Sequence, residues 1–333
     1  MISTNWGAAT DTGLVRHENQ DAFFAQMPIF VVADGMGGHA GGALASSLAV
    51  EEFQSLQASG GPPTVEAIAH AIDGANRRIR AQATAVSGAE GMGTTVVGLA
   101  LVSDRDQDLW LVFNIGDSRL YRLSEGALIQ ITTDHSEVQE LVEAGAITVE
   151  AARHHPERNV ITRAVGVSDD VAPDFWLRPP ETGERFLLST DGLTGEIDDD
   201  DIRQVLVDET DPSVAALRLV ERAISAGGHD NVTAVVVDVL TVNDRPGEDE
   251  GDTARSRPTQ SDDAPDASGG GDEPKPQVLI DTVPVTPGSS GGEAGSRSGG
   301  PLVTPREMID QVPVDASFSQ DGATGGPDGG QEP

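Results

Sequence analysis

The sequence predicts an α+β fold in which antiparallel β-sheets are covered by pairs of α-helices. Two observations predict it. Segments with an apolar period of two follow one another directly, separated by short turn signals, as antiparallel strands do. Segments with helical spacing come in pairs at two separate places. A doubly wound parallel sheet would alternate single strands with single helices instead, so that class is not favoured.

The first half of the chain is predicted to contain one strand, two helices and then a run of strands. Residues 29–33 form a short apolar run ending at Asp34-Gly35, which is typical of a buried strand that leads into a turn. Helical spacing begins at Gly41 and again after Pro62-Pro63, where proline suits the first helical turn. The segments expected to form successive strands are 94–102, 108–116, 118–126 and 127–132, with a hairpin at Glu125-Gly126.

The second half is predicted to repeat this arrangement after an insertion. Residues 136–167 carry two short helical patterns and polar residues, which indicates an insertion over a sheet edge. A strand over 184–190, two helices over 199–209 and 212–226, and a last strand over 231–240 follow. The four carboxylates from Asp198 to Asp201 are expected to cap the first of these helices, with an accessory calcium site as the alternative.

Composition divides the chain into a domain over 1–240 and a tail over 241–333. The tail is acidic and rich in Gly, Pro and Ser, so it is predicted to be disordered because it has too little apolar surface to bury. Within it, Ile280 to Val285 recurs as a near-repeat at Ile309 to Val314. Two interpretations stay open: chance in low-complexity sequence, or a docking motif that adds a strand to a partner's sheet edge.

Charge and composition exclude several classes of protein. The chain has 55 acidic and 21 basic residues and a net charge of −34, which argues against binding nucleic acid through its phosphates. It has no cysteine, which excludes disulfides, thiolate metal sites and enzymes with a cysteine nucleophile. No segment has the apolar length of a signal peptide or a membrane span. We therefore expect a monomeric, cytoplasmic protein without a membrane partner.

Four aspartates occupy separate turns that are flanked by glycine or made of polar residues: Asp34, Asp117, Asp191 and Asp230. Carboxylates brought close together repel and cannot all stay ionised unless cations hold them. Carboxylate oxygens favour Mg²⁺ or Mn²⁺ over zinc. Arg16 lies on a loop nearby in the predicted fold, where its guanidinium suits a phosphate; the alternative is a surface arginine paired with Glu18.

Seven segments carry a resemblance to a known family. Residues 13–21 (GLVRHENQD), 31–39 (VVADGMGGH), 91–95 (GMGTT), 114–121 (NIGDSRLY), 159–166 (NVITRAVG), 187–193 (LLSTDGL) and 229–233 (HDNVT) stand in this order. Together they resemble the metal-dependent PP2C (PPM) family of protein Ser/Thr phosphatases in its bacterial form, over residues 3–240. The resemblance implies a four-layer α-β-β-α sandwich of two antiparallel sheets flanked by helix pairs.

The resemblance also implies a metal centre. Asp34 would bridge two Mg²⁺ or Mn²⁺ ions, with the backbone carbonyl of Gly35 as a further ligand. Asp191 and Asp230 would complete the site on one ion, and Asn231 would orient Asp230.

Three further residues receive roles from the resemblance. Asp21 would act through a metal-bound water, and Asp117 would help Asp191 to bind a third, weaker ion. Arg16 would hold the substrate phosphate, which makes Arg16 and Asp34 the expected catalytic residues.

The general acid is the one departure from eukaryotic relatives. Those relatives have a histidine directly after the Asp-Gly pair, where this chain has Met36, which cannot donate a proton. His39 lies three residues later, and His154 and His155 lie in the insertion, the expected flap. We expect a metal-bound water to take the role, with the flap histidines as the alternative.

These expectations combine into one function. The resemblance implies hydrolysis of phosphoserine and phosphothreonine in proteins by a metal-activated water, reversing Ser/Thr protein kinases, so that phosphoproteins and kinases are the expected partners. The alternative is a catalytically weak binding or regulatory module that acts through its tail. A calcineurin-like phosphoesterase, suggested by residues 116–119, would need His and Asn motifs that the sequence lacks.

Overall fold

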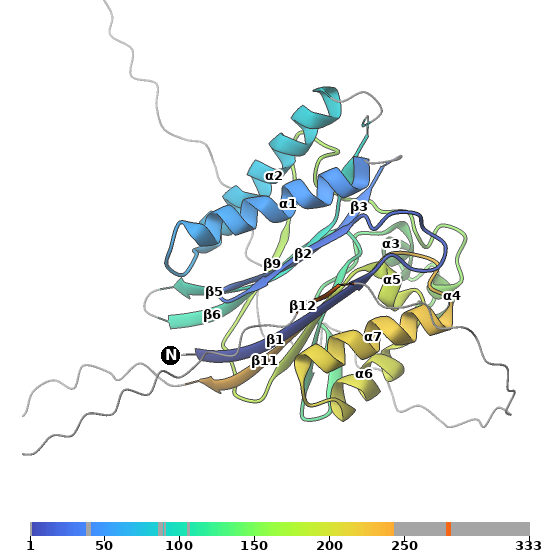
Figure 1. Ribbon diagram of the computed structural model, residues 1–333. Coiled ribbons are helices and arrows are strands. Elements are labelled where there is room, and N and C mark those ends of the chain that lie inside the picture. The colour runs from blue at the N-terminus through green and yellow to red at the C-terminus, as the bar shows by residue number, and fades with distance from the viewer. Residues whose placement is uncertain are drawn as a thin grey trace, which may run out of the picture.

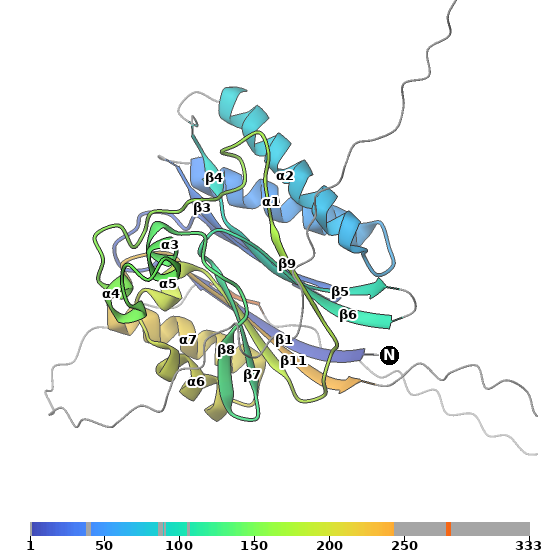
Figure 2. The ribbon, with the colours of Figure 1, turned by 180° about the vertical axis from the view of Figure 1, so that it is seen from behind.

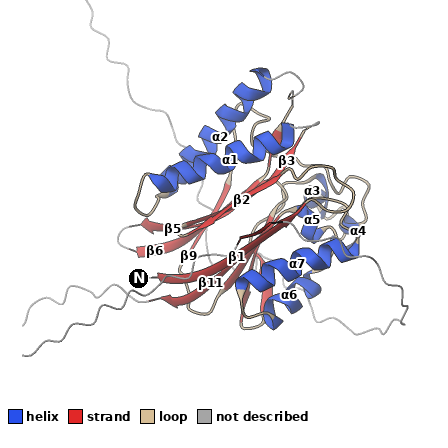
Figure 3. Ribbon diagram, in the orientation of Figure 1, coloured by secondary structure: helices blue, strands red, loops and turns tan. Residues whose placement is uncertain are grey.

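The computed structural model describes residues 2–37, 41–85, 89, 91–104 and 107–242, together with the backbone of residues 278–280. Within these ranges, two β-sheets are stacked face to face and helices cover both outer faces (Figure 1). Figure 3 shows the same four layers in the order helix, strand, strand and helix. The predicted α-β-β-α sandwich is therefore confirmed.

The first sheet has the strand order β12-β1-β11-β10-β7-β8. Its strands are β1 (Ile2–Asp11), β7 (Arg119–Ser124), β8 (Ala127–Gln130), β10 (Arg185–Ser189), β11 (Val232–Val242) and β12 (Val278–Ile280). All neighbours are antiparallel except β12, which pairs with β1 in parallel. This edge pair is a departure from the predicted purely antiparallel arrangement.

The second sheet has the order β2-β3-β5-β6-β9, with the short β4 also paired to β3. Its strands are β2 (Asp21–Gln26), β3 (Ile29–Met36), β4 (Gly93–Thr94), β5 (Val96–Asp104), β6 (Gln107–Ile115) and β9 (Asp174–Arg178). Every pairing in it is antiparallel.

The helices fall into three groups, which Figures 1 and 2 show from opposite sides. The second sheet is covered by α1 (Gly41–Ala58) and α2 (Val65–Ala85). The first sheet is covered by α5 (Asp191–Thr194), α6 (Asp199–Asp208) and α7 (Pro212–Ala226). Residues 136–167, which we call the flap segment, contain α3 (Glu137–Glu143) and α4 (Val149–Arg153).

Along each strand, successive side chains point in turn to the core between the two sheets and to the core between that sheet and its helices. On β6, Trp110 faces the first sheet and packs edge-on against Phe186, with ring centroids 5.9 Å apart. Phe113 faces the helices and stacks on Phe53 of α1 at 5.4 Å. Both are fully buried, and Trp176 on β9 is partly buried against the same core. Apolar burial on three levels thus fixes how the sheets stack.

The sequence analysis gave no bounds for four strands and one short helix. They are β1, β2, β9, β12 and α5. β1 lacks a run of large apolar residues because α7 lies directly against it: a Cβ atom at Gly7 would come within 2.2 Å of the Ser213 backbone. The predicted hairpin is confirmed, since β7 and β8 pair across Glu125 and Gly126, which have φ of 52° and 80°.

The predicted tail lies almost wholly outside the described residues. β11 continues to Val242, two residues beyond the expected domain boundary, and Ile280 of the first near-repeat is the last residue of β12. The second near-repeat, Ile309 to Val314, lies outside the described range, so its docking role stays a prediction. Among the helices that the structure describes, none combines the length and apolar character needed to cross a bilayer.

Candidate active site

Strand pairing in the second sheet places two aspartates side by side. Asp21 begins β2 and stands directly opposite Asp34 near the end of β3 in the antiparallel register. Directly opposite side chains in such a ladder have Cβ atoms about 5 Å apart. The two carboxylates that are thirteen positions apart in the sequence therefore belong to one site.

The first sheet brings three more aspartates to the facing edge. Asp117 lies just before β7, Asp191 directly follows Thr190 at the end of β10, and Asp230 lies just before β11. β10 is the neighbour of both β7 and β11, and Thr190 N–H donates to the Thr233 carbonyl at 3.2 Å. The sandwich thus places the ends of its two sheets, and their carboxylates, against each other.

The backbone of Asp34 is fixed by the Gly-Thr-Thr segment that contains β4. Asp34 N–H donates to Thr95 Oγ1 at 2.9 Å, and its carbonyl accepts from Thr95 N–H at 2.9 Å and from Thr94 Oγ1 at 2.8 Å. Gly35 follows in a crowded position, where a Cβ atom would lie 2.1 Å from the Gly42 carbonyl oxygen. Only glycine fits there, so the start of α1 can approach the turn closely.

Mutual repulsion and burial dominate the electrostatics of the site. Burial raises the pKa of Asp34 well above its usual value, and the charges of Asp21, Asp191 and Asp117 raise it further. Burial also raises the pKa of Asp191, whose carboxyl group shares a hydrogen bond with that of Asp34. Burial and like charges thus both favour the uncharged form of these carboxyl groups, so a bound cation would relieve the repulsion in the cluster.

Asp117 and Asp21 extend this cluster on either side. Burial raises the pKa of Asp117 well above its usual value, followed by repulsion from Asp191. Burial raises the pKa of Asp21 to about 7, although two hydroxyl groups oppose the shift. Those hydroxyls belong to Thr190 and Thr233, which donate to Asp21 Oδ2 at 2.9 and 2.7 Å. Asp21 is thus held in one orientation with its other oxygen free.

Three carboxylate oxygens of the cluster are buried without a hydrogen-bond partner: Asp21 Oδ1, Asp117 Oδ1 and Asp191 Oδ1. A buried carboxylate oxygen without a partner is costly, so the group fits divalent cations with oxygen ligands. In the described part of the chain, no three acidic, histidine or cysteine side chains are gathered closely enough to hold a metal ion by themselves. Any bound Mg²⁺ or Mn²⁺ would need waters or backbone oxygens as further ligands.

Arg16 reaches the same cluster from the loop between β1 and β2. Its Nη2 donates to Asp230 Oδ2 at 2.6 Å, and this hydrogen bond is the main reason that its pKa is raised. The alternative partner, Glu18, is not the residue that Arg16 contacts. The Arg16 side chain is 53% exposed, so its guanidinium remains accessible to a ligand.

Asn231 acts mainly on the loop that carries Arg16. Its side-chain oxygen accepts from Gln20 N–H at 2.8 Å, and its Nδ2 donates to the carbonyls of Thr12 and Glu18 at 2.9 and 3.0 Å. The backbone N–H of Asn231, not its side chain, donates to Asp230 Oδ1 at 2.8 Å. The predicted orientation of Asp230 is therefore made by the peptide group, and the side chain anchors the loop.

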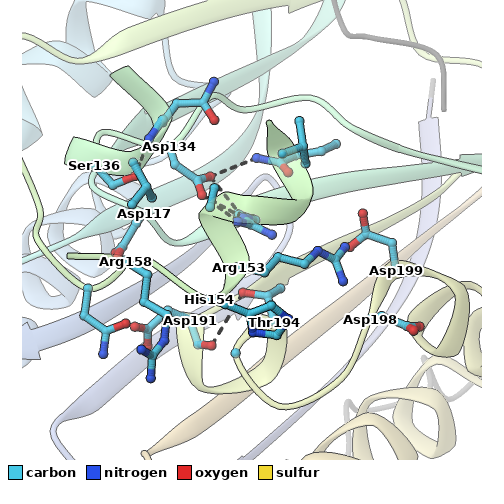
Figure 4. Close-up of a pocket in the computed structure, with 18 of the residues that line it drawn as sticks. Asp117, Asp134, Ser136, Arg153, His154, Arg158, Asp191, Thr194, Asp198 and Asp199 are labelled. Carbon is cyan, nitrogen blue, oxygen red and sulfur yellow. Dashed lines mark hydrogen bonds and ion pairs between the residues drawn. The ribbon is translucent and has the colours of Figure 1, made fainter. Parts of the chain in front are cut away.

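A cavity of about 700 Å³ opens beside the cluster, between the flap segment and the start of α6 (Figure 4). Asp117 and Asp191 line one part of it, and Arg153, His154 and Arg158 line it from the flap segment. Within the described residues, neither Arg153 nor Arg158 forms an ion pair.

The histidines considered as proton donors lie in different places. His154 lines the cavity, whereas His155 Nδ1 accepts from Glu157 N–H within the flap segment. Met36 ends β3 beside Gly93, and His39 lies outside the described residues.

Two neighbouring groups have structural roles. Asp198 accepts from Asp201 N–H at 2.8 Å and caps α6, which confirms the predicted cap. Arg119 donates through Nε and Nη2 to both oxygens of Asp134, at 2.7 to 3.0 Å. Arg119 is therefore engaged by Asp134, whereas Arg16 contacts Asp230.

Sequence reasoning assigned no role to the threonines that hold the aspartates. Thr95, Thr190 and Thr233 each donate to, or accept from, the backbone or side chain of a clustered aspartate. Their signal was present, because each lies inside one of the motif segments. Thr190 and Thr233 lie within three residues of an aspartate, and Thr95 directly follows β4, which pairs with β3. What the sequence does not state is which aspartate each threonine contacts.

Comparison with known proteins identifies the family. The sequence profile described as Protein phosphatase 2C matches residues 15–233, which contain every clustered aspartate and Arg16. The chain belongs to the protein phosphatase 2C family. It is 41% identical over 238 residues to the serine/threonine protein phosphatase PstP of Mycobacterium tuberculosis, covering 71% of this chain and 45% of PstP. The chain thus spans a little under half of that relative's length.

Shorter relatives and solved structures agree. The serine/threonine phosphatase stp of Listeria monocytogenes is 35% identical over 239 residues, covering 69% of this chain and 93% of that protein. The crystal structure of the M. tuberculosis phosphatase PstP/Ppp matches with a TM-score of 0.67 and 37% identity, over 72% of this chain and all of that chain. The PstP catalytic domain in complex with two manganese ions matches with a TM-score of 0.66 and 36% identity, over the same shares.

Proposed function

We propose that this chain is a Mg²⁺- or Mn²⁺-dependent protein phosphatase that hydrolyses phosphoserine and phosphothreonine in proteins and so reverses Ser/Thr protein kinases. The observation that carries the proposal is the set of buried carboxylates without cationic partners beside an accessible arginine. Membership of the protein phosphatase 2C family supports it, as does the manganese found in the PstP catalytic domain.

The residues that would hold the ions follow from the geometry of the cluster. Asp34 lies among Asp21, Asp117 and Asp191 in electrostatic reach of each, which suits a bridging ligand between two ions. Asp191 and Asp230 would complete the site on one ion, and Asp117 would add a third, weaker one. The Gly35 carbonyl is a further ligand in this proposal. When bound, such ions lower the pKa of water and offset charge on phosphate oxygens.

Arg16 would bind the substrate phosphate. Its fork geometry can contact two non-bridging oxygens, and the anion it now contacts, Asp230, would be taken over by a cation. Release from Asp230 frees donors without leaving a buried charge, since half of the arginine side chain is exposed. Arg16 thereby serves substrate binding, while the aspartates serve the hydrolytic step.

The remaining residues exclude covalent catalysis through a thiol and shape access. The chain has no cysteine, so no thiolate can attack phosphorus. The cavity beside the cluster has room for side chains that flank a phosphorylated residue, which favours a protein substrate over a small metabolite. The cytoplasmic location and the monomeric state remain predictions from the sequence.

The alternative, a weakly active binding module, has no specific observation in its favour. Every carboxylate that the family resemblance assigned to the ions lies in or beside the cluster. A protein that had lost turnover would have no reason to keep several repelling carboxylates buried together, because the cluster costs stability.

The test uses the full chain with a phosphothreonine peptide and p-nitrophenyl phosphate in the presence of Mn²⁺. We expect release of phosphate from both, and complete loss with excess EDTA. Asp208→Asn serves as a matched control because Asp208 is an exposed carboxylate of α6 that bonds only Gln204 among the described residues. Turnover that survives strong chelation, or an inactive wild type with normal manganese binding, would reject the proposal.

A further inference from the structure

A buried histidine that the family motifs leave without a role connects the site to the flap segment. His135 lies between β8 and α3 and is 5% exposed. It directly precedes Ser136, whose side chain caps α3 at the start of the flap segment. A buried imidazole usually has partners for both ring nitrogens, and the two partners here belong to different parts of the site.

One side of His135 fixes the turn that carries Asp117. His135 N–H donates to the Gly116 carbonyl at 2.9 Å, and Gly116 N–H donates to His135 Nδ1 at 3.1 Å. Gly116 has a φ of 109° and lies so close to Thr95 that a Cβ atom would approach its methyl carbon within 2.5 Å. The Gly116 carbonyl belongs to the peptide bond that leads into Asp117. Both bonds therefore restrict where the Asp117 carboxylate can lie.

The other side of His135 contacts both the start of β9, through Asp174, and the far end of the flap segment, through Thr162 and Arg163. His135 Nε2 lies 3.1 Å from Asp174 Oδ2, and Arg163 Nη1 donates to Asp174 Oδ1 at 3.1 Å. Thr162 N–H donates to the His135 carbonyl at 2.8 Å. Arg163 Nη1 also lies 3.2 Å from His135 Nε2. Because Nδ1 accepts from Gly116, the partners place the ring proton on Nε2, so His135 and Arg163 both donate to Asp174 and Arg163 does not donate to the ring.

The contact with Asp174 is strong enough to matter. Burial raises the pKa of Asp174, but the hydrogen bond from His135 and the charge of Arg163 outweigh it and hold the pKa below its usual value. Ser136 and Ile161 also form a β-bridge across the base of the flap segment. His135 is thus clamped at the point where the flap segment leaves the domain and returns to it.

We propose that His135 is a positioning residue that couples the Asp117 turn to the base of the flap segment. Its Nδ1 edge sets Asp117 for the weaker ion, and its Nε2 edge sets the flap segment over the neighbouring cavity. The inference rests on the proposed function, because it gives Asp117 its role toward an ion. The affinity for the metal and the affinity for the substrate are then linked through the imidazole of His135, which contacts neither the metal nor the substrate.

Two substitutions separate the two edges of the ring. In His135→Asn the amide oxygen can take the place of Nδ1 and accept from Gly116, but the side chain at position 135 no longer reaches Asp174, which keeps only Arg163. In His135→Gln the amide nitrogen can take the place of Nε2 and donate to Asp174, but Gly116 N–H loses its acceptor. The pair therefore removes one contact each from the same buried position, with thermal unfolding as the check that both fold.

Calorimetric measurement of Mn²⁺ binding to the full chain tests the contact between His135 Nδ1 and Gly116. We expect His135→Gln to weaken Mn²⁺ binding about tenfold, as loss of one buried hydrogen bond can. His135→Asn should stay within about twofold of wild type, which amounts to rescue by the residue that keeps the acceptor. Equal weakening in both variants, or none in either, would overturn the inference.

Substrate kinetics test the Nε2 edge. We expect His135→Asn to raise KM for a phosphothreonine peptide severalfold at saturating Mn²⁺, with kcat for p-nitrophenyl phosphate little changed. Asp174→Asn should reproduce this pattern and gives the same test should His135→Asn not fold. An unchanged peptide KM in Asp174→Asn would contradict the coupling.

Amide hydrogen exchange separates this inference from the proposed function. Residues 116–118 should exchange faster in His135→Gln than in His135→Asn, while residues 160–163 should show the reverse order. Hydrogen exchange needs no turnover. It therefore tests whether His135 joins the Asp117 turn to the base of the flap segment even if the wild type has no phosphatase activity. The same exchange in both variants would refute the clamp with the phosphatase proposal left intact.

Discussion

Carboxylates are buried near both ends of strand β10, but only those at its start are paired with arginines. At its start, Glu184 is 2% exposed and contacts both Arg122 and Arg178, the latter at 2.5 Å. Arg185 forms a two-pronged pair with Asp238 at 2.6 and 2.8 Å. Directly after its end, Asp191 lies among other aspartates, and its Oδ1 has no partner.

The difference teaches which buried charges belong to the scaffold. A carboxylate whose protein partners already neutralise it is complete, and removing a partner leaves an uncompensated charge. A carboxylate that is buried with like charges is incomplete and gains stability when a cation binds. The start of β10 is therefore structural, and the region after its end is a site that needs ions.

Substitution of the carboxylates proposed to hold the ions gives the largest expected effect on activity. Asp34→Asn and Asp191→Ala should lower kcat/KM by about a thousandfold or more, since ions that lose a ligand no longer supply several kcal/mol of stabilisation. The same Asp34→Asn variant without metal should unfold at a higher temperature than wild type, because repulsion in the cluster falls. Loss of activity together with a lower metal-free melting temperature would contradict the comparison.

Substitution at the other end of β10 should have the opposite profile. Glu184→Gln should reduce the free energy of unfolding by about 3 kcal/mol, because Arg122 and Arg178 are left with an uncharged partner in a buried position. Urea denaturation measures this loss. The kcat of the molecules that remain folded should match wild type, and a selective loss of kcat with full stability would place Glu184 in the site.

Arg16 should show an effect on substrate binding smaller than that of the aspartates. Arg16→Ala should raise KM for a phosphopeptide about tenfold, as expected for a lost charge-assisted contact, with a smaller change in kcat. Arg218→Ala is the matched control, since Arg218 is similarly exposed at 57% and pairs with acidic residues on α7 and before it. Equal kinetics for the two variants would remove Arg16 from the phosphate site.

The pH dependence of stability should separate the metal-free and metal-bound protein. The folded-state pKa of Asp21 is raised to about 7, so between about pH 4 and 7 the folded protein holds a proton that the unfolded chain has lost. Stability of the metal-free protein should therefore fall as pH rises through this window, and Asp34, Asp117 and Asp191, whose pKa values are also raised, should add to the fall. Melting temperatures with EDTA should show this slope, and Asp21→Asn should make it shallower.

The tail should have the smallest effect. Removal of residues 243–333 should change kcat and KM for p-nitrophenyl phosphate by less than about twofold, since the three apolar clusters all lie within residues 2–242. Among the residues that the structure describes, the removal takes away the parallel pairing of β12 with β1, at the sheet edge separated from β10 by β1 and β11. A large loss of activity would show that the tail supports the site.

The sequence by itself determined the elements whose pattern is local. The period-two runs predicted β5, β6 and β11, and helical spacing predicted α1, α2 and α7, because burial of one face dictates each pattern. The motif segments were enough to name Arg16 and all five aspartates of the cluster. Strand β1 was not predicted, because its close packing against α7 requires small residues and these leave no apolar pattern to detect.

Tertiary structure alone decided how those residues meet. Opposition of Asp21 and Asp34 depends on strand register, and the shared hydrogen bond of Asp34 and Asp191 depends on how two sheets stack. The choice of Asp230 over Glu18 as the partner of Arg16, and the clamp at His135, join residues far apart in sequence. Such contacts are set by packing between elements, and a linear pattern records only what each element buries by itself.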